Sequence, residues 1–156
     1  MLRARPTFWL ALAAALGLTA FSIHVDRRDA PLGTTECVDG VPMVWIRPGL
    51  PRGESLLVAR HEQRHVEQAL RIGCDAFTAH VSTAEGWLQL EAEAYCADLR
   101  EMMTTERGVR EGADALIDQF LTSWRYRHLQ RLGREHVEKV IYEACESTWP
   151  RAVPSP

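Results

Sequence analysis

The stretch LLVARHEQRHVEQALRI, Leu56 to Ile72, decides how the rest of this chain is interpreted. It contains His61, Glu62 and His65 in the order His-Glu-x-x-His. Residues four apart lie one above the other on the same face of an α-helix, so both imidazoles can point at one ion. Glu62 sits about 100° further round the helix. We therefore expect a helix that binds a metal ion through His61 and His65, with Glu62 placed to take a proton from a metal-bound water.

Hydrophobic periodicity indicates that this helix is central. Apolar side chains share the face of the two histidines, and the charged ones form a narrow seam of Arg60, Arg64, Glu67 and Arg71. The pattern predicts a helix buried over most of its circumference. One alternative is a core helix whose histidines are satisfied by hydrogen bonds alone. Burying two histidines and a carboxylate without a common partner would be costly, which favours the metal.

Composition limits the possible functions. The chain has 156 residues, enough for one domain, and 46% of them are hydrophobic, enough for a modest core. Its formal net charge of −3 argues against a nucleic-acid-binding protein, which would show a basic patch or stripe. We expect a single domain over residues 31–149, followed by a disordered tail over 150–156.

Residues 1–30 have the composition of a targeting segment. Arg3 and Arg5 precede a run without charges from Phe8 to Ile23. That length lies between the apolar region of a secretory signal and a full membrane span, so a cleaved signal and an uncleaved membrane anchor are both open. A buried globular helix fits less well, because such helices usually carry a polar seam. Either favoured interpretation places the domain outside the cytoplasm, and the uncleaved anchor makes the membrane a partner.

A short β-hairpin is predicted before the histidine helix. After a linker over Pro31–Thr35, two strands over Glu36–Val38 and Val41–Arg47 flank an Asp39-Gly40 turn. Pro42 places the second strand at a sheet edge. Such an edge could bind an extended peptide by β-augmentation, or the hairpin could only pack against the helices.

Three further helices are expected after Gly73, which has the position of a helix-ending residue. Residues 74–82 form a connection of uncertain structure, and Ser82 with Glu85 resembles a capping box. The first of the three helices is predicted to run from this capping box to about Arg107, and a break follows at Gly108–Gly112. The other two are predicted over Ala113–Leu132 and Arg134–Trp149. The first of these two should place Leu116, Phe120, Trp124 and His128 on a stripe that faces the core. The expected fold is therefore α+β and mostly helical.

A third metal ligand is needed, because a catalytic zinc site has three protein ligands and an open position. The second helix offers Glu91 and Glu93. Helical phase puts Glu91 on an apolar stripe with Leu88 and Tyr95, whereas Glu93 lies on a polar, solvated face. We expect Glu91 to face inward and to complete the site, although it could instead reach solvent from the edge of the stripe.

HEQRH followed by EAEAY resembles the gluzincin branch of the zincin metallopeptidases, and in particular small metallopeptidases of bacteria and phages with HExxHVxQ and ExEAY. The resemblance covers Leu56 to Leu99. It implies that His61, His65 and Glu91 bind zinc, that Glu62 is the general base, and that a peptide bond is hydrolysed. Tyr95 stands where many gluzincins have an aspartate that orients a histidine. Tyr95 or Asp98 could supply that contact.

A peptidase also needs a hydrogen-bond donor for the oxyanion of the tetrahedral intermediate. By residue type alone the candidates are His80, Tyr126, His128 and His136, and the sequence does not choose among them. Because the sequence identifies no such donor, a second function stays open. In this alternative the chain is an exported, zinc-stabilised binding module without catalytic activity.

The four cysteines, Cys37, Cys74, Cys96 and Cys145, include no CxxC pair. An even number of cysteines in a small exported domain predicts two disulfides, with three possible connectivities. Cys96 lies on the side of its helix away from Glu91, which argues against a role as a zinc ligand. The alternative, four buried thiols, requires a reducing compartment.

Overall fold

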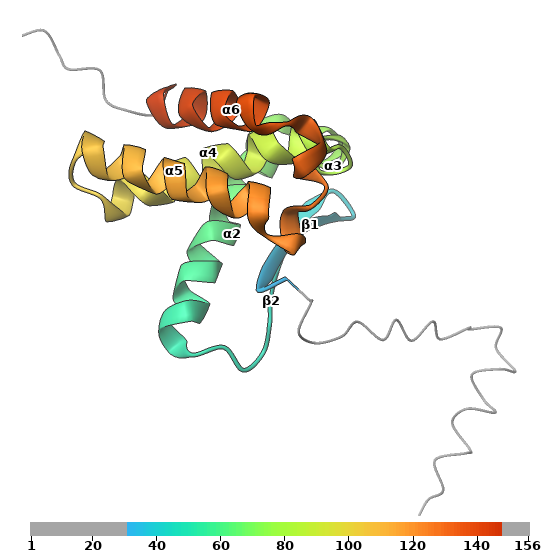
Figure 1. Cartoon of the computed structure of the whole chain (residues 1–156). Helices are drawn as coiled ribbons and strands as arrows, with labels where there is room; N and C mark the ends of the chain where they lie inside the picture. The colour runs from blue at the N-terminus through green and yellow to red at the C-terminus, as the bar shows by residue number, and fades with distance from the viewer. Residues whose placement is uncertain (1–30, 148–156) are drawn as a thin grey trace, which may run out of the picture. The chain divides into compact units, whose positions relative to one another are not determined.

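The structure is a computed structural model, and it describes residues 31–147. The predicted targeting segment and the predicted tail lie outside these residues. Figure 1 shows a β-hairpin followed by helices, and within the described residues the α+β, mostly helical fold is confirmed. The elements are β1 (Gly33–Val38), β2 (Val41–Ile46), α2 (Arg52–Ile72), α3 (Cys74–Val81), α4 (Ala84–Met102), α5 (Glu106–Thr122), two 3₁₀ turns, η1 (Trp124–Tyr126) and η2 (Leu129–Leu132), and α6 (Arg134–Ser147).

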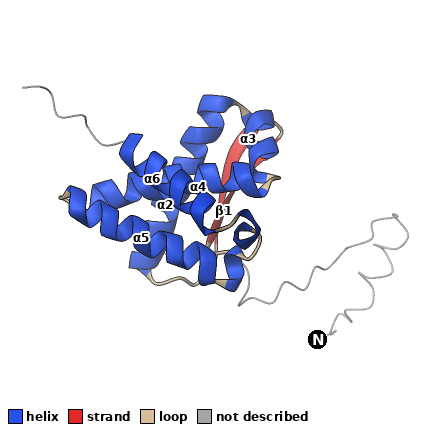
Figure 2. Cartoon of the chain, turned by 45° about the horizontal axis from the view of Figure 1, so that its top comes forward, coloured by secondary structure: helices blue, strands red, loops and turns tan. Residues whose placement is uncertain are grey.

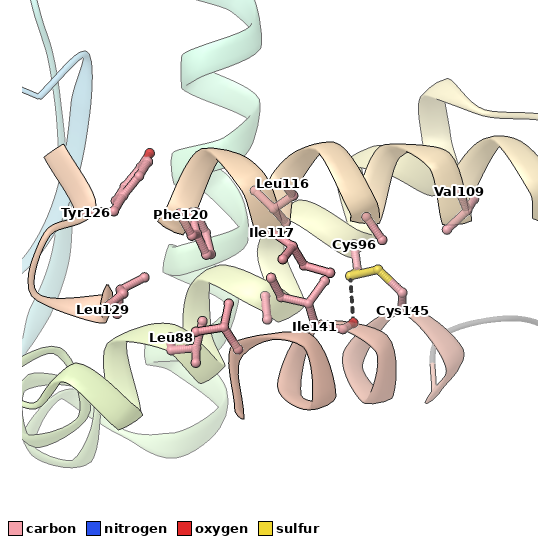
Figure 3. Packing of buried hydrophobic residues seen from close by; sticks show 13 residues of the cluster. Leu88, Cys96, Val109, Leu116, Ile117, Phe120, Tyr126, Leu129, Ile141 and Cys145 are labelled. Atoms are coloured by element: carbon pink, nitrogen blue, oxygen red, sulfur yellow. Dashed lines mark hydrogen bonds between the residues drawn. A yellow bond between two sulfur atoms is a disulfide. The ribbon is translucent and has the colours of Figure 1, made fainter. Parts of the chain in front are cut away.

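The hydrophobic core lies between α4, α5 and α6 (Figure 3). Side chains from all three helices and from the 3₁₀ turns fill it, among them Leu88, Cys96, Ile117, Phe120, Leu129 and Ile141. Residues 88, 92 and 96 recur every four positions on α4, so one side of this helix faces the core. The opposite side of α4 is left to contact α2.

Helix α2 packs across α4 and against the hairpin, which is the pair of strands visible among the helices in Figure 2. A small second cluster of Ala69, Phe77 and Leu90 joins α2, α3 and α4. Only the middle of α2 is buried, and Leu56 and Leu57 in its first half are 62% and 58% exposed. The prediction of burial over most of the circumference was wrong, because neighbouring elements cover only one side of this helix.

The hairpin turns at the predicted dipeptide. Asp39 and Gly40 both have positive φ, 52° and 78°, as a type I′ turn requires, and Val38 pairs with Val41. Strand β1 already begins at Gly33, so the predicted linker is partly strand. A β-carbon at Gly33 would lie 2.6 Å from Cγ1 of Val58, and only glycine therefore lets β1 approach α2 this closely.

Several predicted helix boundaries were wrong. The uncertain connection is helix α3, and the N-cap of α4 is Thr83, which accepts a hydrogen bond from the backbone N–H of Gly86, rather than Ser82. The break after α4 falls at residues 103–105, and α5 runs through both glycines that predicted it. A β-carbon at Gly112 would meet Leu99 at 2.5 Å, so this glycine allows α4 and α5 to pack closely.

Helix α5 ends at Thr122, ten residues before the predicted end, and the chain continues in the two 3₁₀ turns. This change of direction removes His128 from the predicted core stripe. Its side chain is exposed, whereas Leu116 and Phe120 are buried as expected.

Two disulfides are present, as predicted: Cys37 to Cys74, and Cys96 to Cys145. The first ties β1 to α3, and the second ties α4 to α6 within the core. Such bridges are typical of proteins in oxidising compartments outside the cytoplasm. Within residues 31–147, no helix has the length and apolar character needed to cross a membrane.

Candidate metal centre

His61 and His65 lie one turn apart in the middle of α2, and Glu91 faces them from α4. The Nε2 atom of His61 lies 3.3 Å from Oε2 of Glu91, and the Nε2 atom of His65 lies 3.4 Å from Oε1 of the same carboxylate. One ligand atom from each residue lies within 4.8 Å of the other two, so the three residues could hold a metal ion. Two imidazole nitrogens and one carboxylate oxygen are a donor set that suits zinc.

Both histidines are oriented by hydrogen bonds to their other ring nitrogen. Nδ1 of His61 lies 2.9 Å from Oδ2 of Asp98, and Nδ1 of His65 lies 2.8 Å from Oε1 of Gln68. Each partner can accept only if Nδ1 carries the hydrogen, which leaves both Nε2 lone pairs directed at the position of an ion. The sequence had offered Tyr95 or Asp98 as the residue that orients a histidine; in the structure Asp98 makes this hydrogen bond.

Gln68 was not predicted in this role. Its side-chain amide donates to the carbonyl oxygen of Leu90 and to the carboxylate of Glu93, so it links His65 to α4. Gln68 lies three residues after His65, and this spacing puts the two side chains on the same helix face, so the sequence could have indicated the contact. Glu93 also accepts a hydrogen bond from Arg71, and its side chain is 39% exposed, so it lies on a polar and partly solvated face of α4.

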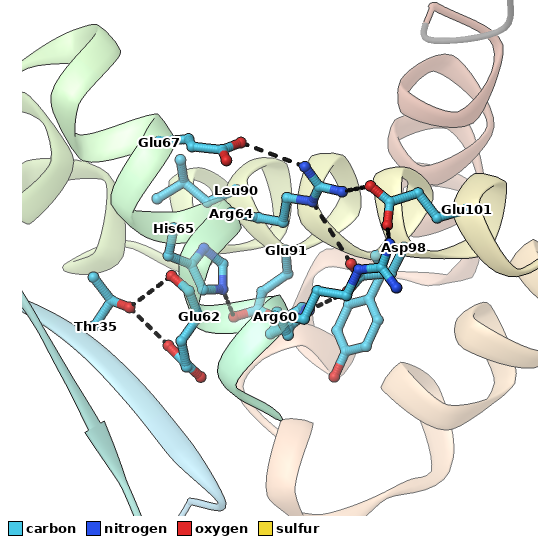
Figure 4. A network of polar contacts seen from close by, with 12 residues as sticks. Thr35, Arg60, Glu62, Arg64, His65, Glu67, Leu90, Glu91, Asp98 and Glu101 are labelled. Carbon is cyan, nitrogen blue, oxygen red and sulfur yellow. Dashed lines mark hydrogen bonds and ion pairs between the residues drawn. The ribbon is translucent and has the colours of Figure 1, made fainter. Parts of the chain in front are cut away.

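A charged network supports Asp98 on the side away from His61 (Figure 4). Nε of Arg64 lies 3.7 Å from Oδ1 of Asp98, and Arg64 also binds Glu101. Arg60 pairs with the same carboxylate of Glu101. Two residues of the charged seam predicted on α2, Arg60 and Arg64, thus face the end of α4, and Arg64 contacts the aspartate that orients His61.

Glu62 is buried beside the histidines, with an exposed fraction of 5%. The hydroxyl of Thr35 donates to its Oε2 at 2.8 Å and lies 3.2 Å from its backbone oxygen (Figure 4). A β-carbon at Gly33 would lie 2.8 Å from Cγ of Glu62, so β1 closes directly over this side chain. Burial raises the pKa of Glu62, which moves a carboxylate toward the range useful for a general base.

A cavity of about 400 Å³ opens beside these residues. Its wall includes His61, Glu62 and Glu91, and most of the remaining lining is apolar or aromatic: Leu57, Val58, Trp87, Tyr95, Leu99, Met102 and Tyr126. This volume is within the usual range for small-ligand sites, roughly 300–1,000 Å³. The cavity can therefore admit a small ligand next to the candidate metal ligands.

The structure separates the four candidate oxyanion donors into two groups. Tyr126 and His128 line the cavity. His80 instead hydrogen-bonds the carbonyl oxygen of Ala76 within α3, and His136 on α6 pairs with Glu85. Of the four candidates, Tyr126 and His128 are the ones that lie in the cavity wall.

Opposing effects set the charges of the candidate ligands. Burial lowers the pKa of His61, but the hydrogen bonds to Asp98 and Glu91 outweigh it and raise the pKa to about 9. For Glu91, burial raises the pKa, and the hydrogen bonds with both histidines lower it to about 2. Without a metal ion, a charged histidine therefore faces a charged carboxylate.

This cluster predicts that, as the pH rises, the metal-free protein loses stability while the stabilisation added by zinc increases. The pKa of His61 is raised on folding, so its stabilising effect is complete below about pH 6.5 and is lost as the pH rises through 9. The metal-free protein should lose on the order of 2–3 kcal/mol of unfolding free energy across that window. Zinc requires neutral histidines, so stabilisation by zinc should grow with pH over the same window.

Urea unfolding at pH 6, 7, 8 and 9, with and without zinc, measures both slopes. His61→Asn should reduce the loss in the metal-free protein without abolishing it, because the pKa of His65 is also raised: burial lowers it, but the hydrogen bond with Glu91 outweighs burial. His80→Asn, outside the cluster, should keep the full loss. A metal-free protein whose stability is constant or increases from pH 6.5 to 9 would contradict the assignment.

Comparison with known proteins does not place this chain in a family: no family model matches it, and neither the curated proteins nor the solved structures include a significant match. The site therefore has to be interpreted from its own geometry.

Proposed function

We propose that this protein is a zinc-dependent metallopeptidase that acts outside the cytoplasm. The observation that carries the proposal is the convergence of Nε2 of His61, Nε2 of His65 and the Glu91 carboxylate at the edge of a cavity that also contains Glu62. These are the ligand types of a catalytic zinc site with three protein ligands. The two disulfides and the apolar run before the domain support export.

The role of each residue follows from its position. Zinc supplies a Lewis acid that polarises a carbonyl oxygen and makes water easier to deprotonate. Glu62 takes the proton of the attacking water and later gives it to the leaving amine, and Thr35 holds its carboxylate in place. Asp98 and Gln68 fix the rings of His61 and His65. The apolar cavity wall suits a peptide or protein substrate.

The alternative, a zinc-stabilised binding module without catalysis, is favoured by one observation. Cross-strand pairing places Val38, Val41, Met43 and Trp45 on the sheet face opposite Thr35, and all four are between 43% and 56% exposed. An apolar sheet face without a covering layer is typical of an interaction surface.

Metal analysis and hydrolysis of the purified full chain test the proposal. We expect one zinc per chain and cleavage of an unfolded protein or a broad peptide library, detected by mass spectrometry. A chelator should abolish cleavage, and added zinc should restore it. Protein that holds one zinc and cleaves nothing would favour the binding module, and protein that binds no zinc would contradict both functions.

A further inference from the structure

The wall of the cavity also carries two phenol groups. The hydroxyl oxygens of Tyr95 on α4 and Tyr126 on η1 lie 3.4 Å apart, and both residues line the cavity. The ring of Tyr95 lies against that of His61, with a centroid distance of 4.3 Å. The ring that carries one hydroxyl of the pair is therefore in contact with a candidate metal ligand.

Hydrogen-bond counting leaves one of these hydroxyls with a free hydrogen. Each phenol has one O–H donor, and in a pair only one of the two hydrogens can lie between the oxygens. Within residues 31–147, the only hydrogen bond of either hydroxyl is to the other. A buried donor without an acceptor costs free energy, so the second hydrogen needs an acceptor that enters the cavity.

The pair is also held rigidly. The Tyr126 ring packs against Phe120 and Trp87 at centroid distances of 4.7 and 5.5 Å. In Figure 3 its hydroxyl oxygen lies at the end of the ring remote from Leu129. Tyr95 contacts Phe120 as well. Donors fixed before the substrate arrives need no reorganisation as charge develops, which is the condition for strong electrostatic stabilisation.

We propose that the hydroxyl pair of Tyr95 and Tyr126 donates the hydrogen bond that stabilises the oxyanion in peptide hydrolysis, an inference that depends on the proposed function. As water attacks the peptide carbon, the carbonyl π-electron pair moves onto its oxygen, and the spare phenol hydrogen bonds to that oxygen. The hydrogen stays on the phenol, so the pair neither gains nor loses a proton.

Other side-chain donors also line the cavity: Arg60, which pairs with Glu101, the indole N–H of Trp87, Arg125 and His128. His128 is exposed and contacts the edge of Trp87, and burial lowers its pKa, which favours the neutral ring. Within residues 31–147, no ring contact joins His128 or Arg125 to His61, whereas the Tyr95 ring lies against it. Replacing His128 or Arg125 therefore tests whether one of them, rather than the tyrosine pair, donates to the oxyanion.

The test compares Tyr95→Phe, Tyr126→Phe and the double variant, each as the zinc-loaded full chain with its zinc content checked. Calorimetry measures binding of a phosphinic pseudopeptide, whose tetrahedral anion resembles the intermediate, and of a peptide thiol, which binds metal through sulfur alone. The double variant should bind the phosphinate roughly 10²–10³-fold more weakly and lose kcat by a similar factor. Each single variant should lose less, because either phenol can present the spare hydrogen. Thiol binding should change by less than about twofold.

Tyr142→Phe is the matched control, because Tyr142 is the third tyrosine of the chain and hydrogen-bonds Asp114 away from the cavity. It should change neither ligand's affinity. Phosphinate affinity within about threefold of wild type in the double variant would overturn the inference. An equal loss of thiol binding, or a loss confined to His128→Gln or Arg125→Gln, would do the same. If the wild type hydrolyses no peptide, the proposed function fails and the catalytic role of the hydroxyl pair fails with it; phosphinate binding then shows only whether the pair binds a tetrahedral anion.

Discussion

Replacing Glu62 with glutamine should leave zinc bound and lower kcat by roughly 10²–10⁴-fold. Glutamine has nearly the same shape, and its Oε1 can still accept the hydrogen bond that Thr35 donates to Glu62. What the variant loses is the ability to take a proton from water. Because Glu62 is absent from the three candidate ligands, zinc content should match that of the wild type. Single-turnover rates and metal analysis of the same preparation measure both quantities.

Glu67→Gln is the matched control for this prediction. Glu67 is a carboxylate on the same helix, its side chain is 55% exposed, and its one polar contact within residues 31–147 is a long one of 3.5 Å with Arg64. Its replacement should change neither zinc content nor rate. If Glu62→Gln keeps more than about a tenth of the wild-type rate, general base catalysis by Glu62 is the wrong mechanism.

Helical periodicity alone was enough to predict the parts of the candidate site that lie on one helix. Positions 61 and 65 on α2, and 91, 95 and 98 on α4, share faces because backbone hydrogen bonds fix the angle between successive residues. The same reasoning placed Cys96 on the opposite side of α4 from Glu91, where it bonds Cys145. Such inferences need no knowledge of how the helices pack.

Contacts between distant segments could not be predicted in this way. Thr35 reaches Glu62 across 27 residues of sequence, and that contact depends on how the hairpin docks on α2. No pattern within Gly33–Val38 specifies it. The disulfide connectivity was undetermined for the same reason, since three pairings fit the sequence equally well.

Local signals also failed where tertiary packing overrode them. Gly108 and Gly112 read as a helix break, yet α5 passes through both, because Gly112 accommodates Leu99 of α4. Helix α5 then ends early, which moves Tyr126 and His128 onto the cavity wall. The choice between candidate oxyanion donors thus required the three-dimensional arrangement.

Replacing Glu91 with alanine should lower zinc affinity far more than replacing Glu93, although the two lie only two residues apart. Glu91 presents one carboxylate oxygen to each candidate histidine ligand. Its loss leaves two ligands, and the affinity should fall by more than about 100-fold, because changes in groups that only orient ligands typically cost 10 to 100-fold. Competition with a chromogenic chelator measures the affinity.

Glu93→Ala provides the matched control, because it removes the same side chain from the other side of the helix. It loses the ion pair with Arg71 and one hydrogen bond from Gln68, but the Gln68 amide still donates to Leu90 and keeps its oxygen on His65. We therefore expect a loss of zinc affinity below about tenfold and a stability change of about 0–1 kcal/mol. If zinc is lost from Glu93→Ala and retained in Glu91→Ala, the third ligand is on the opposite face of α4. The arrangement of His61, His65 and Glu91 around one ion would then be wrong.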